Sequence, residues 1–172
     1  MIKVIDNFLS KEDFCKISDL LLGSRFPWHY NDCVLVKNIQ GNKVDPNFQF
    51  THAFRCKQMQ KDSVFLPFVF PIGDSLGIKK LYRVKANLTP RTAEHRFTGY
   101  HLDGFDCPHT AIYYINSNNG WTDFKNGDKV ENIKILPGTY DIVVSQKLLS
   151  RFRAKNHDLT YFIALEPDST FG

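Results

Sequence analysis

The chain has 172 residues, enough for one domain with a sizeable core, and 42% of them are hydrophobic, as in ordinary globular proteins. Its formal charge of +4 is small and the basic residues are scattered among acids, so nucleic acid is not indicated as a partner. No stretch reaches transmembrane length and residues 1–8 lack the apolar run of a signal peptide, so we expect a soluble, cytoplasmic protein with a single domain over residues 1–172.

The first third of the chain predicts a strand, a helix and a second strand. Residues 2–8 alternate apolar and polar side chains, which is the period of a strand. Ser10, with the acidic residues that follow it, is typical of the start of a helix. That helix has apolar residues at helical spacing, namely Phe14, Ile17, Leu20 and Leu21. Residues 28–39 then predict a strand that ends at a Gly41-Asn42 turn.

Most of the remaining chain predicts strands. Residues 62–76 are apolar, but Pro67 and Pro71 interrupt them, so we expect a short helix there. After residue 80 the pattern is almost wholly β. The predicted strands are 81–88, 110–116, 129–136, 139–145 and 159–165. This succession predicts a mainly β sandwich or barrel that follows amino-terminal helical elements.

His101 and Asp103 form a His-x-Asp pair just before the aromatic strand 110–116. Side chains two residues apart on an extended segment point the same way, so the two can chelate one metal ion. An imidazole nitrogen with a carboxylate oxygen suits Fe(II), and a third ligand from elsewhere would complete a facial triad with open positions. A solvated turn is the alternative explanation, because so short a motif also arises by chance.

Several motifs surround this pair in a distinctive order. They are Lys85-Ala86-Asn87-Leu88, Tyr100-His101-Leu102-Asp103, Ile112-Tyr113-Tyr114-Ile115-Asn116 and Gly120-Trp121-Thr122-Asp123-Phe124, with Asp6-Asn7-Phe8-Leu9 near the amino terminus. The order resembles that of prolyl 4-hydroxylase-like Fe(II)/2-oxoglutarate oxygenases, in particular their phage-type and marine bacterial relatives. The resemblance implies a double-stranded β-helix, the jelly roll of cupin-like proteins, and a dioxygenase that uses Fe(II) and 2-oxoglutarate to hydroxylate a peptidyl side chain or a small metabolite.

The resemblance also assigns site residues. His101 and Asp103 match the first two iron ligands, and Tyr114 matches a tyrosine whose hydroxyl contacts the 2-oxoglutarate carboxylate. Asn87 lies in a segment where a strand leads towards the iron. A core position for Tyr114 and a turn position for Asn87 are the alternatives, because these residue types are common in such places.

The carboxyl-terminal third departs from the family pattern. Tyr140-Asp141 matches the segment that precedes the distal iron-binding His in the family. When the residues after it are counted without gaps, Gln146 occupies the position where the family has that His. The same count places His157 at the Arg or Lys that anchors 2-oxoglutarate. The amide oxygen of Gln is a poorer ligand for iron than imidazole, and His lacks the guanidinium fork that binds a carboxylate.

Three interpretations of this departure stay open. In the first, the register shifts, so that His157 is the third iron ligand and Arg153, Arg151 or Lys155 anchors the carboxylate. In the second, the His-x-Asp pair and water hold the metal, as in relatives with non-hydroxylating chemistry. In the third, the iron site is lost, and the jelly roll serves as a catalytically inactive binding or assembly module.

Other side chains carry simpler expectations. Residues 23–60 form a loop-rich span that we predict to be a lid over the substrate, with the side chains of Trp28, His29, Tyr30 and Phe48. His52, His95 and His109 are further potential ligands, but we expect each to be structural with an ordinary hydrogen bond. His109, the nearest to the His-x-Asp pair, could alternatively face a substrate at the mouth of the barrel. The four cysteines contain no Cys-x-x-Cys pair, which predicts free thiols in a reducing compartment.

Overall fold

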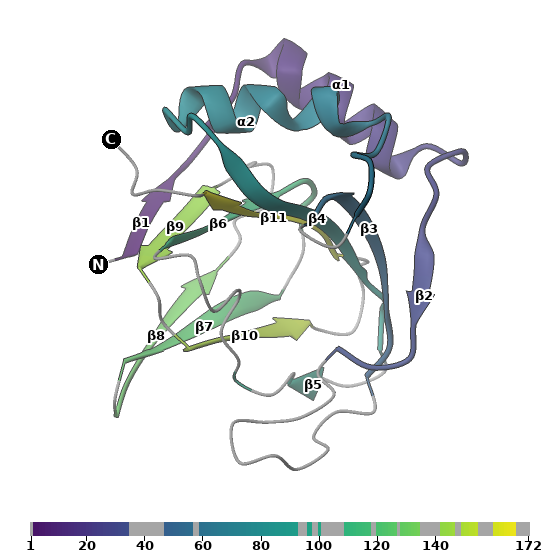
Figure 1. Ribbon diagram of the computed structural model, residues 1–172. Helices are drawn as coiled ribbons and strands as arrows, with labels where there is room; N and C mark the ends of the chain where they lie inside the picture. Colours follow the sequence, from purple (N-terminus) through teal and green to yellow (C-terminus); the bar gives the residue numbers. More distant parts are fainter. Residues whose placement is uncertain are drawn as a thin grey trace.

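The computed structural model describes residues 2–34, 47–56, 59–92, 96–97, 100, 109–117, 120–126, 128–134, 142–146, 149–154 and 160–167 (Figure 1). Across these residues the chain is mostly strand with few helices, which confirms the predicted mainly β class with helical elements near the amino terminus. The helices cover one face of the larger of two sheets, and the smaller sheet lies on its other side (Figure 1). No helix in the described ranges is long and apolar enough to cross a membrane.

The described strands form a seven-stranded and a four-stranded antiparallel sheet. The larger has the order β1 (Ile2–Ile5), β9 (Ile142–Gln146), β6 (His109–Tyr114), β11 (Thr160–Pro167), β4 (Leu81–Thr89), β3 (Gln49–Arg55) and β2 (His29–Asn31). The smaller has the order β5 (Arg96–Phe97), β10 (Leu149–Ala154), β7 (Trp121–Asn126) and β8 (Lys129–Lys134). From β4 to β11 each strand changes sheet relative to the one before it, except that β7 and β8 form a hairpin within the smaller sheet.

Helix α1 (Lys11–Leu22) begins at the residue that the sequence indicates. The Ser10 side-chain oxygen accepts a hydrogen bond from the backbone N–H of Asp13 at 3.1 Å, and its hydroxyl donates to the Asp13 carboxylate at 2.8 Å. These bonds satisfy a helix-end N–H that has no partner within the helix. The helix ends at Gly23, where a Cβ atom would lie 2.8 Å from the carbonyl oxygen of Asp19, so a side chain there requires the backbone to move.

The predicted helix over residues 62–76 is short, as expected, and it has two parts. A 3-10 helix, η1 (Leu66–Val69), leads directly into α2 (Phe70–Ser75). Each part has a proline in its first turn, where the missing N–H removes no helical hydrogen bond. Gly77 follows with φ +69°, a left-handed conformation that glycine adopts without steric cost, and its N–H donates to the carbonyl of Asp74 at 3.0 Å.

The main hydrophobic core lies between the helices and the seven-stranded sheet. Helices α1 and α2 contribute residues that are essentially inaccessible to solvent, among them Ile17, Leu21 and Ile72. The sheet contributes one alternating set from each central strand, namely Phe54, Val84, Ala86, Ala111, Tyr113, Ile163 and Leu165. Burial of one face leaves the opposite set of side chains on these strands facing the smaller sheet.

Several strand predictions need correction. Strands β3, β5, β7 and β10 were not predicted. The first of these lies within the span predicted to be loop, and β7 and β10 carry charged residues, which are less common in strands. The strand predicted over residues 2–8 ends at Ile5, since the chain turns at Asn7, whose φ is +50°. Of the strand predicted over residues 28–39, β2 is the part observed, and residues 35–39 and the Gly41-Asn42 turn lie outside the described residues.

Candidate functional site

The face of the larger sheet that looks towards the smaller one carries the polar residues of interest. In β6, Ala111 and Tyr113 pack in the core under the helices, so the pleat places Ile112 and Tyr114 on the opposite face. Tyr114 is completely buried there. We call this surface the inner face. The prediction that Tyr114 is a site residue therefore concerns a side chain in the closed space between the two sheets.

Tyr114 meets the smaller sheet through its hydroxyl group. The hydroxyl is hydrogen-bonded to the hydroxyl of Thr122, which lies on β7 and is itself buried. Each hydroxyl has one proton and two acceptor lone pairs, so the pair keeps a capacity for further bonds. The two sheets thus contribute one hydroxyl each to the same point of the interior.

Asn87 lies level with Tyr114 on the inner face. Residue 162 of β11 is the cross-strand partner of both, pairing with Asn87 on β4 and with Tyr114 on β6. Partners across antiparallel strands leave the sheet on the same side, so Asn87 and Tyr114 share one row with a single strand between them. Asn87 is 3% exposed, and its side-chain N–H donates to the carbonyl of Lys85 at 3.4 Å. The structure therefore brings these two predicted cofactor-binding residues together in one buried row.

Arg153 lies on the smaller sheet in a neighbouring position. In the register of β10 it pairs with Trp121 on β7 and with Phe97 on β5, whereas Thr122 pairs with Phe152. Arg153 therefore lies one position along β10 from the register partner of Thr122. Gln146, the residue counted to the distal His position, ends β9 in the larger sheet and pairs with His109.

The predicted metal ligands His101, Asp103 and His157 lie outside the described residues. Within the part of the chain that the structure describes, no group of three or more His, Cys, Asp and Glu side chains is arranged to hold a metal ion. The buried hydroxyl pair of Tyr114 and Thr122, with the amide of Asn87 in the row of Tyr114, can donate hydrogen bonds to a carboxylate, which needs such donors when it leaves water.

His52 has the structural role that the sequence predicts. Its Nδ1 is hydrogen-bonded to the carbonyl of Pro27 at 3.0 Å and its Nε2 to the hydroxyl of Ser63 at 2.9 Å. Burial lowers the pKa of His52 below the usual value of 6.5, and the neighbouring His29, whose ring lies 6.1 Å away between centroids, lowers it further. His95 lies outside the described residues.

The contacts of Trp28 argue against its predicted place in a lid over the substrate. Its indole N–H donates to the carbonyl of Leu21 at the end of α1 at 3.3 Å, and its ring packs edge-on against Phe26 with centroids 4.9 Å apart. Trp28 therefore belongs to the packing between helix and sheet. By contrast, Tyr30 and Phe48 are exposed on the β2–β3 edge with ring centroids 5.7 Å apart, and for them the lid stays a prediction.

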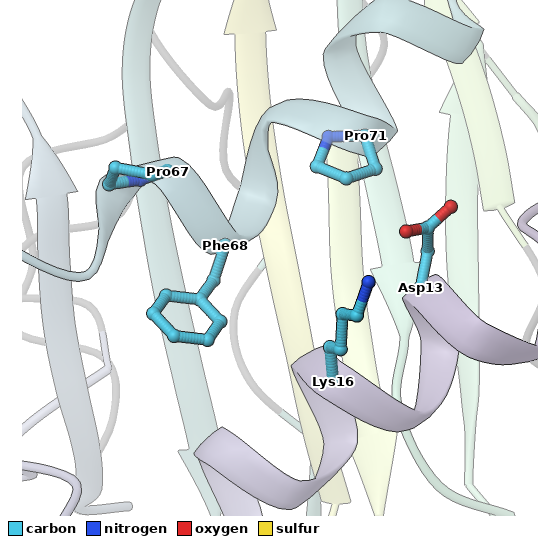
Figure 2. Close-up of a pocket in the computed structure, with 5 residues that line it drawn as sticks. All are labelled: Asp13, Lys16, Pro67, Phe68 and Pro71. Atoms are coloured by element: carbon cyan, nitrogen blue, oxygen red, sulfur yellow. The ribbon is translucent and has the colours of Figure 1, made fainter.

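A surface pocket of about 280 Å³ lies on the helical side of the molecule (Figure 2). Figure 2 shows its lining residues, Asp13 and Lys16 on α1 with Pro67, Phe68 and Pro71 on η1 and α2. Both charged groups are engaged locally, Lys16 with Glu12 at 2.7 Å and Asp13 with Ser10 at 2.8 Å. The pocket lacks the converging polar groups of a catalytic site, so the inner face is the stronger candidate.

Thr122 is the site residue that sequence reasoning missed. It stands in the Gly-Trp-Thr-Asp-Phe motif, but β7 was not predicted as a strand, so nothing assigned a face to its residues. A signal was present in the sequence. Had residues 121–124 been assigned to a strand, Thr122 and Phe124 would have been placed on one face and Trp121 and Asp123 on the other.

Comparison with solved structures identifies the fold. A prolyl hydroxylase from Trichoplax adhaerens, in complex with a peptide fragment of the hypoxia inducible factor oxygen degradation domain, has a TM-score of 0.64 at 13% identity over 96% of this chain and 82% of that one. An oxidoreductase of the 2OG-Fe(II) oxygenase family from Burkholderia pseudomallei has a TM-score of 0.67 at 12% identity over 99% and 87%. A non-haem, α-ketoglutarate-dependent epimerase from nogalamycin biosynthesis has a TM-score of 0.58 at 13% identity over 95% and 76%.

At these identities the likeness shows the fold alone. This chain has the fold of prolyl hydroxylases and other 2-oxoglutarate, Fe(II) oxygenases. Neither a family model nor a curated protein sequence matches it.

Proposed function

We propose that residues 1–172 form one double-stranded β-helix domain that acts as an Fe(II)- and 2-oxoglutarate-dependent dioxygenase, hydroxylating a peptidyl side chain or a small metabolite. The order in which β4 to β11 change sheet supports the architecture, because alternate strands of a double-stranded β-helix lie in facing sheets. The alternation also accounts for a site between the sheets, where Tyr114 and Thr122 meet.

The buried hydroxyl pair of Tyr114 and Thr122, with Asn87 in the row of Tyr114, is the observation that carries the functional proposal. Because one proton of the two hydroxyls is used in the bond between them, a carboxylate placed beside this pair can accept one hydrogen bond from it, and the amide of Asn87 lies in the row of Tyr114. Tyr114 and Asn87 would thus bind and orient 2-oxoglutarate. Its binding in a space closed by both sheets also excludes water from the reaction.

We assign the iron to His101 and Asp103, with His157, Gln146 or water as the third ligand and Arg153 as a predicted carboxylate anchor. Imidazole and carboxylate together are the donor chemistry of a 2-His-1-carboxylate iron site, and the pair leaves positions open on the metal. Bound iron supplies the oxidising chemistry, in which one atom of dioxygen enters a C–H bond of the substrate and the other enters succinate as 2-oxoglutarate loses carbon dioxide. The residues of this chain contribute position, orientation and a dry site.

The proposal is tested by turnover of 2-oxoglutarate. Purified protein is incubated with Fe(II), 2-oxoglutarate and air, alone and with a panel of peptides and amino acids, and succinate is measured by NMR. We expect succinate formation that His101→Ala and Asp103→Ala abolish and Lys129→Ala, a change at an exposed position on β8, leaves unchanged. If the wild-type protein forms no more succinate than Asp103→Ala under every condition, the result would favour the alternative, a jelly roll that has lost its distal iron ligand and serves binding or assembly.

A further inference from the structure

Strand β2 is an outer strand of the seven-stranded sheet, and among the described strands it pairs only with β3 (Figure 1). In an antiparallel pair, alternate residues direct their backbone N–H and C=O groups away from the partner strand, so β2 has hydrogen-bonding groups on its open side. The side chains of His29 and Tyr30 are exposed, that of Tyr30 by 64%. The open side of β2 is therefore accessible to another extended chain.

Three aromatic side chains lie beside this open side, and we call them the edge cluster: Tyr30 on β2, Phe48 just before β3, and Phe50 on β3. The ring centroids are 5.7 Å apart for Tyr30 and Phe48, 5.9 Å for Tyr30 and Phe50, and 6.1 Å for Phe48 and Phe50. Tyr30 and Phe48 are exposed to solvent, so a partner that covered them would gain the free energy of burying apolar surface.

The edge cluster lies on the helical side of the larger sheet. Phe50 is two residues from His52, whose ring packs against aromatic side chains of the main core, and alternate residues of a strand share a face. Tyr30 is the register partner of Phe50, so it leaves the sheet on the same side. The cluster is thus on the opposite face from Asn87 and Tyr114. This position favours a docking surface over the predicted substrate lid.

The charge pattern separates β2 from the other outer strands. Charged side chains on an outer strand discourage pairing with another chain. Each of the other three outer strands of the two described sheets contains such a residue, namely Lys3 in β1, Arg96 in β5, and Lys129 with Glu131 in β8. The segment His29–Asn31 contains no Lys, Arg, Asp, Glu or Pro. Strand β2 therefore lacks the usual protection against strand pairing.

We propose that β2 pairs with β2 of a second copy of this chain, antiparallel to it and about a twofold axis at Tyr30. This arrangement is self-complementary, because it places His29 opposite Asn31 of the partner subunit and brings the two edge clusters together on one face. The acidic residue nearest to β2 in the sequence, Asp32, then lies opposite Trp28 of the partner subunit. The pairing therefore brings no like charges together along the strand.

The size of the contact sets its expected strength. A whole aromatic side chain buries about 150–250 Å², so the exposed parts of Tyr30 and Phe48, with the strand edge, amount to on the order of a few hundred Å² per copy. Stable specific interfaces bury about 800 Å² per partner. We therefore expect a reversible dimer with a dissociation constant in the micromolar range.

Sedimentation velocity of the purified full chain across the micromolar range tests the proposal. The sedimentation coefficient of the wild type should rise with concentration, and that of Tyr30→Lys should stay at the value of the monomer, because two ammonium groups would face each other at the axis. Val130→Lys adds the same charge at an exposed apolar position on the outer strand β8, and this matched control should associate as the wild type does. Circular dichroism checks that each variant is folded.

Hydrogen exchange distinguishes strand pairing from contact between the rings alone. The amides of His29–Asn31 should exchange more slowly at high protein concentration than at low concentration in the wild type, and equally at both in Tyr30→Lys. A dimer that survives Tyr30→Lys, is lost in Val130→Lys, or gives the β2 amides no added protection would overturn the proposal. A wild type that stays monomeric would also overturn it and would leave a strand of another protein as the occupant of this edge. The proposed function is independent of these outcomes.

Discussion

The hydroxyl groups of Tyr114 and Thr122 are hydrogen-bonded to each other although the two residues lie on different sheets. Both side chains are buried, so the bond forms away from competing water. It is a polar contact within an otherwise largely apolar interior, with Ile112, Phe124 and Ala164 nearby in the buried set outside the main core. The pair therefore links the packing of the sheets to the chemistry of the proposed site.

A double-mutant cycle on this pair should show coupling. We expect Tyr114→Phe and Thr122→Val each to lower the free energy of unfolding by about 1–3 kcal/mol, because each removes one partner of a buried hydrogen bond. The double variant should lose less than the sum of the two, by about 0.5–1.5 kcal/mol. Urea denaturation measures all four proteins, with the exposed Tyr30→Phe as a control. Strict additivity would show that the bond contributes nothing to the fold.

Trp28 should matter for stability and not for turnover. Trp28→Phe keeps a ring against Phe26 but removes the indole N–H that donates to the Leu21 carbonyl. We expect a loss of about 1 kcal/mol in the free energy of unfolding and unchanged formation of succinate. A large fall in the rate of succinate formation, with the free energy of unfolding unchanged, would instead support a place for Trp28 in the substrate lid.

The start of α1 gives a local test of stability. Ser10→Ala removes the side-chain oxygen that accepts from the Asp13 N–H and should cost about 1 kcal/mol in the free energy of unfolding. Ser24→Ala, just beyond the end of the helix, is the matched control and should have little effect. Equal losses in the two variants would mean that the Ser10 bond does not cap the helix.

His52 makes the stability depend on pH. Because its pKa is lowered in the folded protein, the unfolded chain takes up a proton more readily near pH 6.5. The contribution of His52 is therefore complete above about pH 6.5 and is lost as the pH falls from there towards the lower, folded pKa. Thermal denaturation between pH 5 and 8 should show a weaker dependence on pH in His52→Asn than in the wild type. His29 is the titratable neighbour, and His29→Asn should leave most of the dependence in place.

Much of the framework could be predicted from the sequence, since its signals are local. The Ser10 cap, the prolines of the short helix and the apolar run of β6 each act through neighbouring residues. Tyr114 and Asn87 were predicted as site residues through motif resemblance, and the structure places both in one buried row.

The rest depended on pairing across the sheets. The contact of Thr122 with Tyr114 depends on the packing of β7 against β6, and the inner-face position of Asn87 follows from which side of β4 the helices cover. Such relationships join residues far apart in the chain, and no local pattern contains them. For the same reason, counting residues along the chain could not establish which side chains of the smaller sheet lie beside Tyr114.

The most direct test of the central claim is an anaerobic titration of the purified protein with Fe(II) in the presence of 2-oxoglutarate, followed by visible absorption. We expect a weak charge-transfer band of the iron chelate that is absent in His101→Ala and is weakened in Tyr114→Phe. If no band forms and no iron is retained by the wild-type protein, the chain does not have the oxygenase site proposed here.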